Sequence, residues 1–262
     1  MAQLTAPIQL SDHVFILYSE FPHAHSGNVY LITGKVPTLI DCGSDRVVPI
    51  LADHLAMLGL DVRDIEQVIA THGDYDHVQG FHGLRRLNPH LRLHIHRSDL
   101  RIVQGENAYQ TASYVYGRPF VRFDVDHCVP VDDGDVIPAG STTLTVHHSP
   151  GHTEGSVCLL GELDGRSILF AGDAVGGAMR SLNGASVEIW VRAAQTWEGT
   201  LQHLSELEFD WVLNGHEPVE TLPIDRSRFD RMAAHFGKMM NPWFSLDELE
   251  HAPAPRMAQP AS

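Results

Sequence analysis

The sequence predicts an α/β fold in which sheets are covered by helices. Short apolar runs, such as residues 29–32 and 167–170, have the length and composition of strands. Between such runs lie segments whose apolar residues recur at spacings of three and four, which is typical of amphipathic helices. Because strand-like and helix-like segments alternate along the chain, the pattern favours layered sheets with helices on their outer faces.

The first half of the chain contains strands, one long helix and a polar loop. Strands are predicted at residues 14–17, 29–32 and 38–40, joined by short turns. A helix is predicted over residues 45–58, where apolar side chains keep a helical spacing: Val48, Leu51, Leu55 and Leu58. Residues 62–70 lead into a segment rich in His and Asp. A short helix over residues 78–87 and an alternating strand over residues 91–96 follow.

The second half repeats this order of strands followed by a helix. Strands are predicted around residues 142–146, 157–160, 167–170 and 211–213, with helices over 193–207 and 226–239. No linker rich in Gly, Ser and Pro interrupts the chain before residue 241, and no internal repeat is visible. We therefore predict one domain over residues 1–262, with a core at about 14–240 and a tail at about 241–262 that contains one short capped turn.

The most informative segment places four metal-binding side chains within six residues, directly after an apolar strand-like run. They are His72, Asp74, Asp76 and His77. Imidazole binds zinc, iron and manganese, and carboxylates bind or bridge cations, so one such turn can serve two metals. The alternative is a polar strand-to-helix loop, but such loops usually carry only one or two capping Asp or His residues. The segment therefore predicts a metal site.

Three further candidate ligands follow strand-like runs downstream. His152 comes after Pro150-Gly151, Asp173 comes after Gly172, and His216 comes after Gly215. A glycine at the end of a strand permits a close backbone approach, and the next side chain can then face a cavity. His147 and His148 lie near His152, but we favour His152 because Pro150-Gly151 turns the chain just before it.

With these motifs in place, the chain resembles the metallo-β-lactamase superfamily. The pattern His-x-Asp-x-Asp-His, then Gly-His-Thr, Gly-Asp and Gly-His, is similar to its branch with a bridging Asp, which includes glyoxalase II-like thioesterases and acyl-homoserine lactonases. Residues 26–32 and 39–43 resemble the opening strands of the family, so the resemblance extends from about Val14 to about Pro218. It implies a four-layer αββα sandwich with the metals at one edge, between the two sheets.

The resemblance also implies the ligands and the chemistry. The first metal site would contain His72, Asp74, His152 and Asp173, and the second would contain Asp76, His77, Asp173 and His216, with Asp173 as the bridge. The expected enzyme is a dinuclear hydrolase that cleaves an ester, lactone or thioester with a metal-bridging hydroxide. Asp76 or Asp74 would orient the water and transfer its proton, so both are candidate catalytic residues.

One position departs from the family pattern, because Asp74 stands where a second His is usual. A carboxylate is a harder ligand than imidazole, which makes the first site more tolerant of iron or manganese. Two divalent ions are expected, zinc first, with iron or manganese as alternatives. Flavodiiron proteins of the same superfamily resemble this chain in having a carboxylate there, so an iron-dependent oxidoreductase is the alternative function.

Other histidines and aromatic residues have two interpretations each. His94 and His96 alternate on one strand and either reach the pocket or form a polar strand face, while His23 and His25 lie in a loop that can overhang the metals. Residues 101–126 and 176–197 are rich in aromatic residues and Met, and either shape an apolar substrate pocket or pack over the sandwich edge or a homodimer contact. Tyr30 and Tyr75 are more typical of packing residues than of oxyanion donors.

The composition of the chain excludes several classes of binding partner and of cellular location. The formal net charge is −15 and no cluster of Lys and Arg forms a basic stripe, so we expect a small-molecule substrate and no nucleic acid. The three cysteines, Cys42, Cys128 and Cys158, are widely spaced and are expected to be buried rather than paired. The sequence shows no signal-peptide pattern and no run of eighteen apolar residues, so we expect a cytoplasmic protein without a membrane partner.

Overall fold

Two β-sheets face each other in the computed structural model, which describes residues 2–21, 25–105, 110–175, 187–216, 218–219 and 222–234. The first sheet has seven strands in the order β2-β3-β5-β6-β7-β8-β9. Its strands are β2 (Ile8–Gln9), β3 (Val14–Tyr18), β5 (Val29–Ile32), β6 (Thr38–Ile40), β7 (Gln67–Ile69), β8 (Arg92–His96) and β9 (Cys128–Val131). The last four of these strands run parallel to one another, so their carboxyl ends share one edge of the sheet.

The second sheet has six strands in sequence order, from β10 to β15. They are β10 (Val136–Ala139), β11 (Thr142–His148), β12 (Val157–Leu163), β13 (Arg166–Gly172), β14 (Trp211–Asn214) and β15 (Ile224–Asp225). Only β13 and β14 are parallel neighbours, so these two strands also end at one edge. A separate two-stranded ribbon pairs β1 (Ala2–Gln3) with β4 (Glu20–Phe21).

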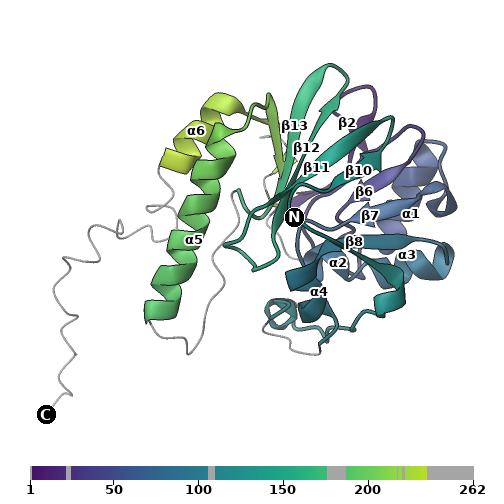
Figure 1. Cartoon of the computed structure of the whole chain (residues 1–262). Coiled ribbons are helices and arrows are strands. Elements are labelled where there is room, and N and C mark those ends of the chain that lie inside the picture. The colour runs from purple at the N-terminus through teal and green to yellow at the C-terminus, as the bar shows by residue number, and fades with distance from the viewer. Residues whose placement is uncertain are drawn as a thin grey trace, which may run out of the picture.

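Helices cover the outer face of each sheet, which makes four layers (Figure 1). On the first sheet lie α1 (Val48–Met57), α2 (Tyr75–Val78), α3 (Phe81–Leu87) and α4 (Arg97–Val103), and on the second lie α5 (Val187–Glu206) and α6 (Arg226–Ala234). The 3₁₀ turns are η1 (Val62–Asp64), η2 (Ser113–Tyr116) and η3 (Val125–His127). The predicted αββα sandwich is therefore confirmed.

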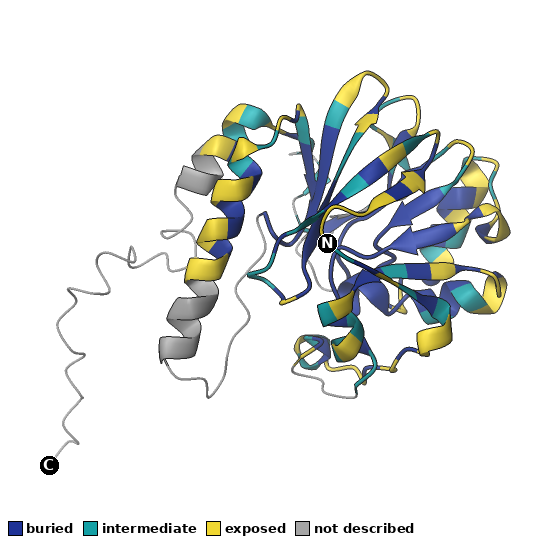
Figure 2. Cartoon of the chain, viewed as in Figure 1, coloured by how far each residue is buried: buried dark blue, intermediate teal, exposed yellow. Residues whose placement is uncertain are grey.

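The period-two alternation of the strands explains the layers. In β6, Leu39 packs towards the helices with Leu51 and Leu55 of α1, whereas Ile40 packs between the sheets with Phe170 of β13. On the other side, a third cluster joins the second sheet to α5 and α6. Strands β5, β6 and β7 are buried on both faces, whereas β10 and β11 also expose residues, and helices such as α1 keep one exposed face (Figure 2). Residues that alternate along one strand thus serve two different cores.

Element boundaries differ from the predicted ones in places with local causes. The predicted helix over 78–87 is divided into α2 and α3, because Gly80 lies against the turn after β6: a Cβ there would lie 2.2 Å from the carbonyl oxygen of Cys42. Helix α1 begins at Val48 rather than at residue 45, and α5 begins at Val187, six residues before the prediction. Residues 235–240 and the predicted tail lie outside the described residues.

Several short elements were not predicted. The end of helix α4 lies in the segment that the sequence predicts as a substrate loop. The sequence pattern also does not predict strands β9 and β10. These elements have only four to seven residues, too few for either period to stand out. Strand β2 also extends the first sheet before Val14. The three cysteines are buried and unpaired, as expected. Among the described residues, no helix combines the length and apolar character needed to cross a membrane.

Candidate metal centre

The loop between β7 and α2 lies at the edge where the parallel strands end, and Asp41 fixes its shape. Asp41 follows β6 and accepts hydrogen bonds from the backbone N of Thr71 at 2.7 Å and from its hydroxyl at 2.8 Å. The other contact of the Asp41 carboxylate is with His77 Nδ1 at 2.9 Å. Asp41 has a φ of 56°, a left-handed conformation that Asp tolerates better than most residues. Asp41 is not among the site residues predicted from the sequence.

A first group of candidate ligands combines residues from three loops. Single donor atoms of His72, His152 and Asp173 all lie within 4.8 Å of one another. Asp74 Oδ2 lies 3.1 Å from His152 Nε2 and 3.7 Å from His72 Nε2. The carboxylate that departs from the family pattern therefore faces the two histidines of the predicted first site.

A second group lies beside the first and shares Asp173 with it. Donor atoms of Asp76, His77 and His216 also lie within 4.8 Å of one another. Asp173 Oδ1 is 3.5 Å from His77 Nε2, while its Oδ2 is 3.2 Å from His216 Nε2 and 3.5 Å from His152 Nε2. The Asp173 carboxylate thus contacts histidines of both groups, which is the arrangement expected of a bridging ligand.

The electrostatics of the two groups suit bound cations. Asp74, Asp76 and Asp173 are each at most 4% exposed, so three carboxylates are buried close together. Burial disfavours the charged form of His77, but Asp76, Asp173 and Asp41 outweigh it and raise its pKa to about 9. Burial likewise opposes ionisation of Asp76, yet His77 and His216 lower its pKa to about 2. Three buried anions that stabilise positive charge fit the donor set of a divalent metal site.

One donor atom and one glycine support the same conclusion. Among the described residues, Asp173 Oδ1 is buried and accepts no hydrogen bond, so it is available to a cation. Gly215 lies so close that a Cβ there would be 2.0 Å from Asp173 Oδ1 and 2.8 Å from His77 Cε1. Only glycine permits the chain to bring His216 against these two side chains.

Tyr116 reaches the centre from η2, in the predicted substrate segment. Its hydroxyl donates to Asp76 Oδ2 at 2.6 Å, and its ring stacks on Tyr75 with the centroids 5.4 Å apart. Burial and the neighbouring Asp76 raise the pKa of Tyr116, so the phenol remains a donor. The sequence predicts Tyr116 as a pocket or packing aromatic and not as a partner of Asp76, because no spacing rule connects a loop tyrosine to an aspartate forty residues earlier.

We expect Tyr116→Phe to weaken metal binding at the group that contains Asp76 by about 10-fold, because loss of a hydrogen bond to a ligand typically has this effect. Competition with a chelator measures the affinities of the two sites separately. Tyr75→Phe is the matched control, since the Tyr75 hydroxyl donates to Asp45 and not to a candidate ligand. Equal metal affinities in Tyr116→Phe and the parent protein would contradict this role.

The other histidines form separate contacts. His96 stacks on His148 with the ring centroids 4.2 Å apart, and His25 Nδ1 lies 2.7 Å from the buried Glu20 carboxylate. His94 is not in either ligand group, and burial lowers its pKa to about 4. His23 lies outside the described residues. The structure therefore places His152, not His148, at the centre.

The aromatic residues of the two predicted substrate segments divide between packing and the site. Phe120 and Phe123 are buried and pack with Phe81 in the first core, as the packing interpretation expected. Trp197 of α5 is 1% exposed and lies edge-on to His152, with the ring centroids 5.9 Å apart. The side chain of Trp190 and the whole of Tyr109 and Met179 lie outside the described residues.

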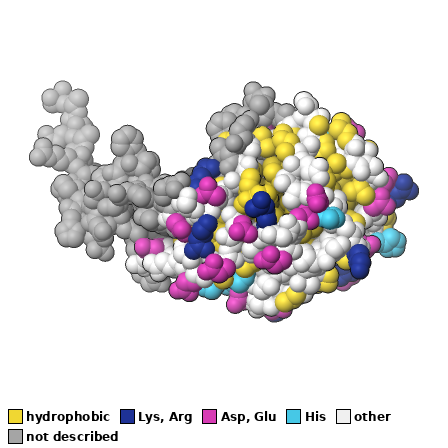
Figure 3. Space-filling view, turned by 90° about the horizontal axis from the view of Figure 1, so that it is seen from above, with side chains coloured by type: hydrophobic (Ala, Val, Ile, Leu, Met, Phe, Trp, Pro, Cys, Tyr) yellow, Lys and Arg dark blue, Asp and Glu magenta, His cyan; other side chains and the backbone are white. Residues whose placement is uncertain are grey.

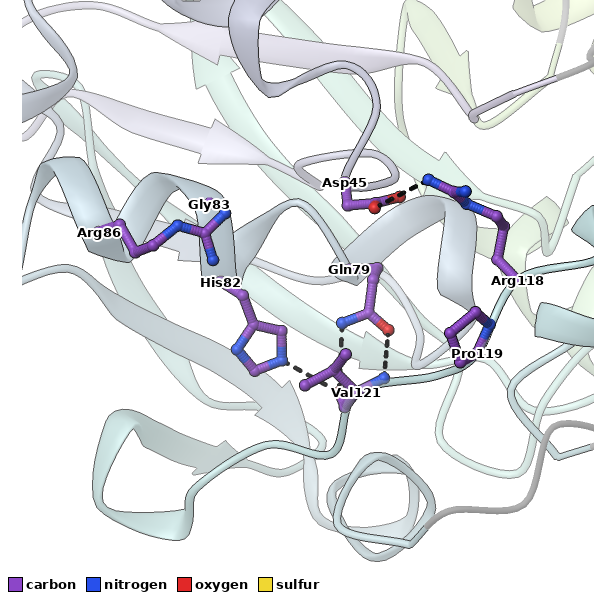
Figure 4. A pocket seen from close by; sticks show the side chains of 8 residues that line it. All are labelled: Asp45, Gln79, His82, Gly83, Arg86, Arg118, Pro119 and Val121. Carbon is purple, nitrogen blue, oxygen red and sulfur yellow. Dashed lines mark hydrogen bonds and ion pairs between the residues drawn. The ribbon is translucent and has the colours of Figure 1, made fainter.

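A separate cavity of about 380 Å³ lies between α3 and residues 118–121 and contains none of the candidate ligands. Figure 4 shows Gln79 and His82 turned towards Val121: the Val121 N donates to Gln79 Oε1 at 3.0 Å, and Gln79 Nε2 and His82 Nε2 contact its carbonyl oxygen at 3.2 and 3.0 Å. Arg118 forms an ion pair with Asp45 at 3.4 Å. These contacts fasten the segment that follows Tyr116 to Asp45, Gln79 and His82.

The charges on the surface follow the acidic composition. On the face shown in Figure 3, the described Lys and Arg side chains lie singly among Asp and Glu side chains and form no continuous stripe.

Comparison with known proteins identifies the family. A model of the metallo-beta-lactamase superfamily matches residues 24–216. This chain belongs to the metallo-β-lactamase superfamily. The matched region includes every candidate ligand from His72 to His216. Together with its hydrolase relatives, this match identifies the chain as a metal-dependent hydrolase. The superfamily fold implies divalent metal ions, for which the two His and Asp groups are suitable.

Individual members of the superfamily are similar over different lengths. The acyl-coenzyme A thioesterase MBLAC2 of Bos taurus is 29% identical over 236 residues, which cover 79% of this chain and 79% of the relative. The hydroxyacylglutathione hydrolase of Aeromonas salmonicida is 29% identical over 167 residues, or 63% of this chain and 51% of the relative. The structure of the metallo-β-lactamase GOB-18 from Elizabethkingia meningoseptica matches with a TM-score of 0.73 at 20% identity, over 95% of this chain and 94% of that one. The last comparison supports the fold alone.

Proposed function

We propose that this chain is a dinuclear metal hydrolase that cleaves a carboxylic ester, lactone or thioester, with an acyl thioester as the preferred class. The position of Asp173 is the observation that carries the proposal, because its carboxylate lies between two groups of His and Asp residues. A structural zinc site closes four ligands around one ion. Seven candidate ligands around a shared carboxylate exceed that need and favour two ions.

Seven residues would hold the two ions. The first would be bound by His72, Asp74, His152 and Asp173, and the second by Asp76, His77, Asp173 and His216. When bound, two divalent cations lower the pKa of a water molecule and polarise a substrate carbonyl. Zinc is the first choice, and Asp74 makes iron or manganese acceptable as well.

The protein's own residues orient the ligands and handle the proton. The contact between His77 Nδ1 and Asp41 turns Nε2 towards Asp76 and Asp173. Asp76, whose Oδ2 also accepts from Tyr116, is the proposed proton acceptor, and Asp74 is the alternative one. Trp197 packs beside His152 and donates its Nε1–H to the carbonyl oxygen of Ala174 at 2.8 Å, which fixes the indole ring against this side of the centre.

A thioester is preferred because of the relatives. The acyl-coenzyme A thioesterase MBLAC2 is similar over most of both chains. For the partners, we still predict that the protein binds neither nucleic acid nor a membrane and that it can form a homodimer. For the location, we still predict the cytoplasm.

A second candidate function, an iron-dependent oxidoreductase, is favoured only by Asp74. A carboxylate 3.1 Å from His152 suits iron better than a second imidazole would. Redox turnover would also require an external electron donor.

The test is metal analysis followed by a substrate panel. We expect the protein purified without added metal to contain two metal ions per chain, to lack visible absorption, and to hydrolyse an acyl thioester faster than a lactone or a β-lactam. Chelation should abolish the activity and zinc should restore it. His152→Ala should lose the activity, whereas His90→Ala, at an exposed position outside the site, should retain it. No hydrolysis with both metals bound would refute the proposal, and two irons with an oxygen-sensitive spectrum and no hydrolysis would favour the oxidoreductase instead.

A further inference from the structure

Asp99 is a fully buried carboxylate that the proposed mechanism does not use. It lies on α4 and is 0% exposed. Its Oδ2 accepts hydrogen bonds from the Gly73 backbone N and from the Thr153 hydroxyl, both at 2.7 Å. Its Oδ1 accepts a third from the Gly155 backbone N at 2.8 Å. A buried carboxylate with three donors is a strong local constraint, because its removal would take the acceptor from the Gly73 and Gly155 backbone N–H groups and one of two partners from the Thr153 hydroxyl, which also lies 2.8 Å from Ser156 Oγ.

The donors belong to the two loops that carry the candidate ligands of the first site. Gly73 lies between His72 and Asp74, and Thr153 follows His152 directly. The first loop follows β7 of the seven-stranded sheet, and the second connects β11 and β12 of the six-stranded sheet. One carboxylate therefore joins the two sheets at the point where three ligands of the first site must meet.

The packing around Asp99 leaves little freedom for either loop. A Cβ at Gly155 would lie 2.6 Å from Asp99 Cγ, and a Cβ at Gly73 would lie 3.3 Å from Asp99 Cβ. The two glycines allow the loop backbones to press against the carboxylate from two sides.

The second group of ligands is held by a different set of contacts. Asp41 contacts His77 Nδ1, Gly27 N donates to the Asp76 carbonyl oxygen at 3.1 Å, and Asn28 N donates to the Gly215 carbonyl oxygen at 2.7 Å. Asp99 takes part in none of these three contacts. Loss of Asp99 should consequently disturb the two metal sites unequally.

We propose that Asp99 is a positioning residue that holds the loops of His72, Asp74 and His152 together and sets the metal affinity of the first site alone. This inference rests on the two-metal centre of the proposed function. It goes beyond that function because it assigns a separate positioning residue to one of the two ions.

Asp99→Asn tests the proposal with almost no change in side-chain size. The amide replaces one acceptor oxygen with a donor nitrogen, which then faces an N–H or O–H donor and loses at least one of the three hydrogen bonds. We expect one ion to be retained with unchanged affinity and the other to be bound about 10- to 100-fold more weakly, as is typical when a partner of the ligands is removed. Competition with a chelator gives both affinities, and the absorption spectrum of the cobalt-substituted protein reports the ligands of the ion that remains.

Thr153 offers a matched pair that keeps Asp99 itself intact. Thr153→Val removes the hydroxyl with little change in volume and should weaken the same ion. Thr153→Ser keeps the hydroxyl and should bind both ions with affinities close to those of the parent protein. Asp53→Asn, at an exposed position on α1, controls for the general effect of losing one negative charge. If the Asp99–Thr153 contact supported only the fold, the weakening in Thr153→Val would not be confined to one metal site. The expected result is weakening of one site in Thr153→Val and none in Thr153→Ser.

Two results with Asp99→Asn would overturn the proposal, and so would one result with the parent protein. Unchanged affinity for both ions in Asp99→Asn would show that the hydrogen bonds do not matter for binding, and equal weakening of both ions would show that Asp99 supports the whole fold. If Asp99→Asn fails to fold, the Thr153 pair decides the question in the same way. A parent protein that binds two ions but hydrolyses no thioester, lactone or ester would refute the proposed function and leave the metal titrations decisive for Asp99. A parent protein that binds fewer than two ions would overturn both.

Discussion

Replacing Asp173 by Asn is expected to weaken both bound ions by at least about 10-fold and to reduce hydrolysis by about 100-fold or more. The reason is its position: its two oxygens lie 3.2 to 3.5 Å from nitrogens of His77, His152 and His216. The amide keeps the size of the side chain but removes the negative charge that serves both groups. Elemental analysis and the rate of thioester hydrolysis measure the two effects.

The matched control for this change is Asp53→Asn, which removes one negative charge from the exposed face of α1. It should leave metal content and turnover unchanged. If Asp173→Asn kept both ions at full affinity and turned over normally, Asp173 would not be the bridge, and the dinuclear assignment would have to be abandoned.

Asp74 is the site of the second large effect, because there the chain departs from the pattern of its own superfamily. We expect Asp74→Ala to weaken the first site by about 10-fold or more, while the ion held by Asp76, His77, Asp173 and His216 is retained. The Asp74 carboxylate lies 3.1 Å from His152 Nε2, so its removal leaves the first site with His72, His152 and the bridge.

The reverse substitution tests the metal preference. Asp74→His restores the common motif and should keep both ions while shifting the preference of the first site from iron or manganese towards zinc, because imidazole is a softer ligand than carboxylate. Competition between zinc and manganese, followed by elemental analysis, gives the ratio for each variant. If Asp74→Ala bound both ions with unchanged affinity, Asp74 would be a bystander and the inference about metal choice would be wrong.

Strand positions and the order of candidate ligands were accessible from the sequence, because both depend on local patterns. Short apolar runs placed β3, β5 and β6 within about one residue of their observed limits. The segment from His72 to His77 was conspicuous because four metal-binding side chains follow one strand. The interpretation of Phe120 and Phe123 as packing residues, one of two that we left open, matches their place in the core.

The sequence could not predict elements of only a few residues or contacts between distant segments. Helix α4 has seven residues, and its three apolar residues, Leu100, Ile102 and Val103, all lie in the last turn, so it lacked a periodic pattern. Nothing in the neighbourhood of Tyr116 or Asp99 connects them with Asp76 or Thr153, which lie forty and fifty-four residues away.

By itself, the sequence determined which chemical groups are available and in what order strands and loops present them, because side-chain type and hydrophobic period are local properties. Only the tertiary structure decided which of these groups meet. The loops that follow β7, β11, β13 and β14 meet at one edge, where Asp173 contacts histidines of both groups. The choice of His152 over His148, the hydrogen bond from Tyr116 and the junction at Asp99 all depend on how two sheets pack face to face, and that packing is a property of the whole chain.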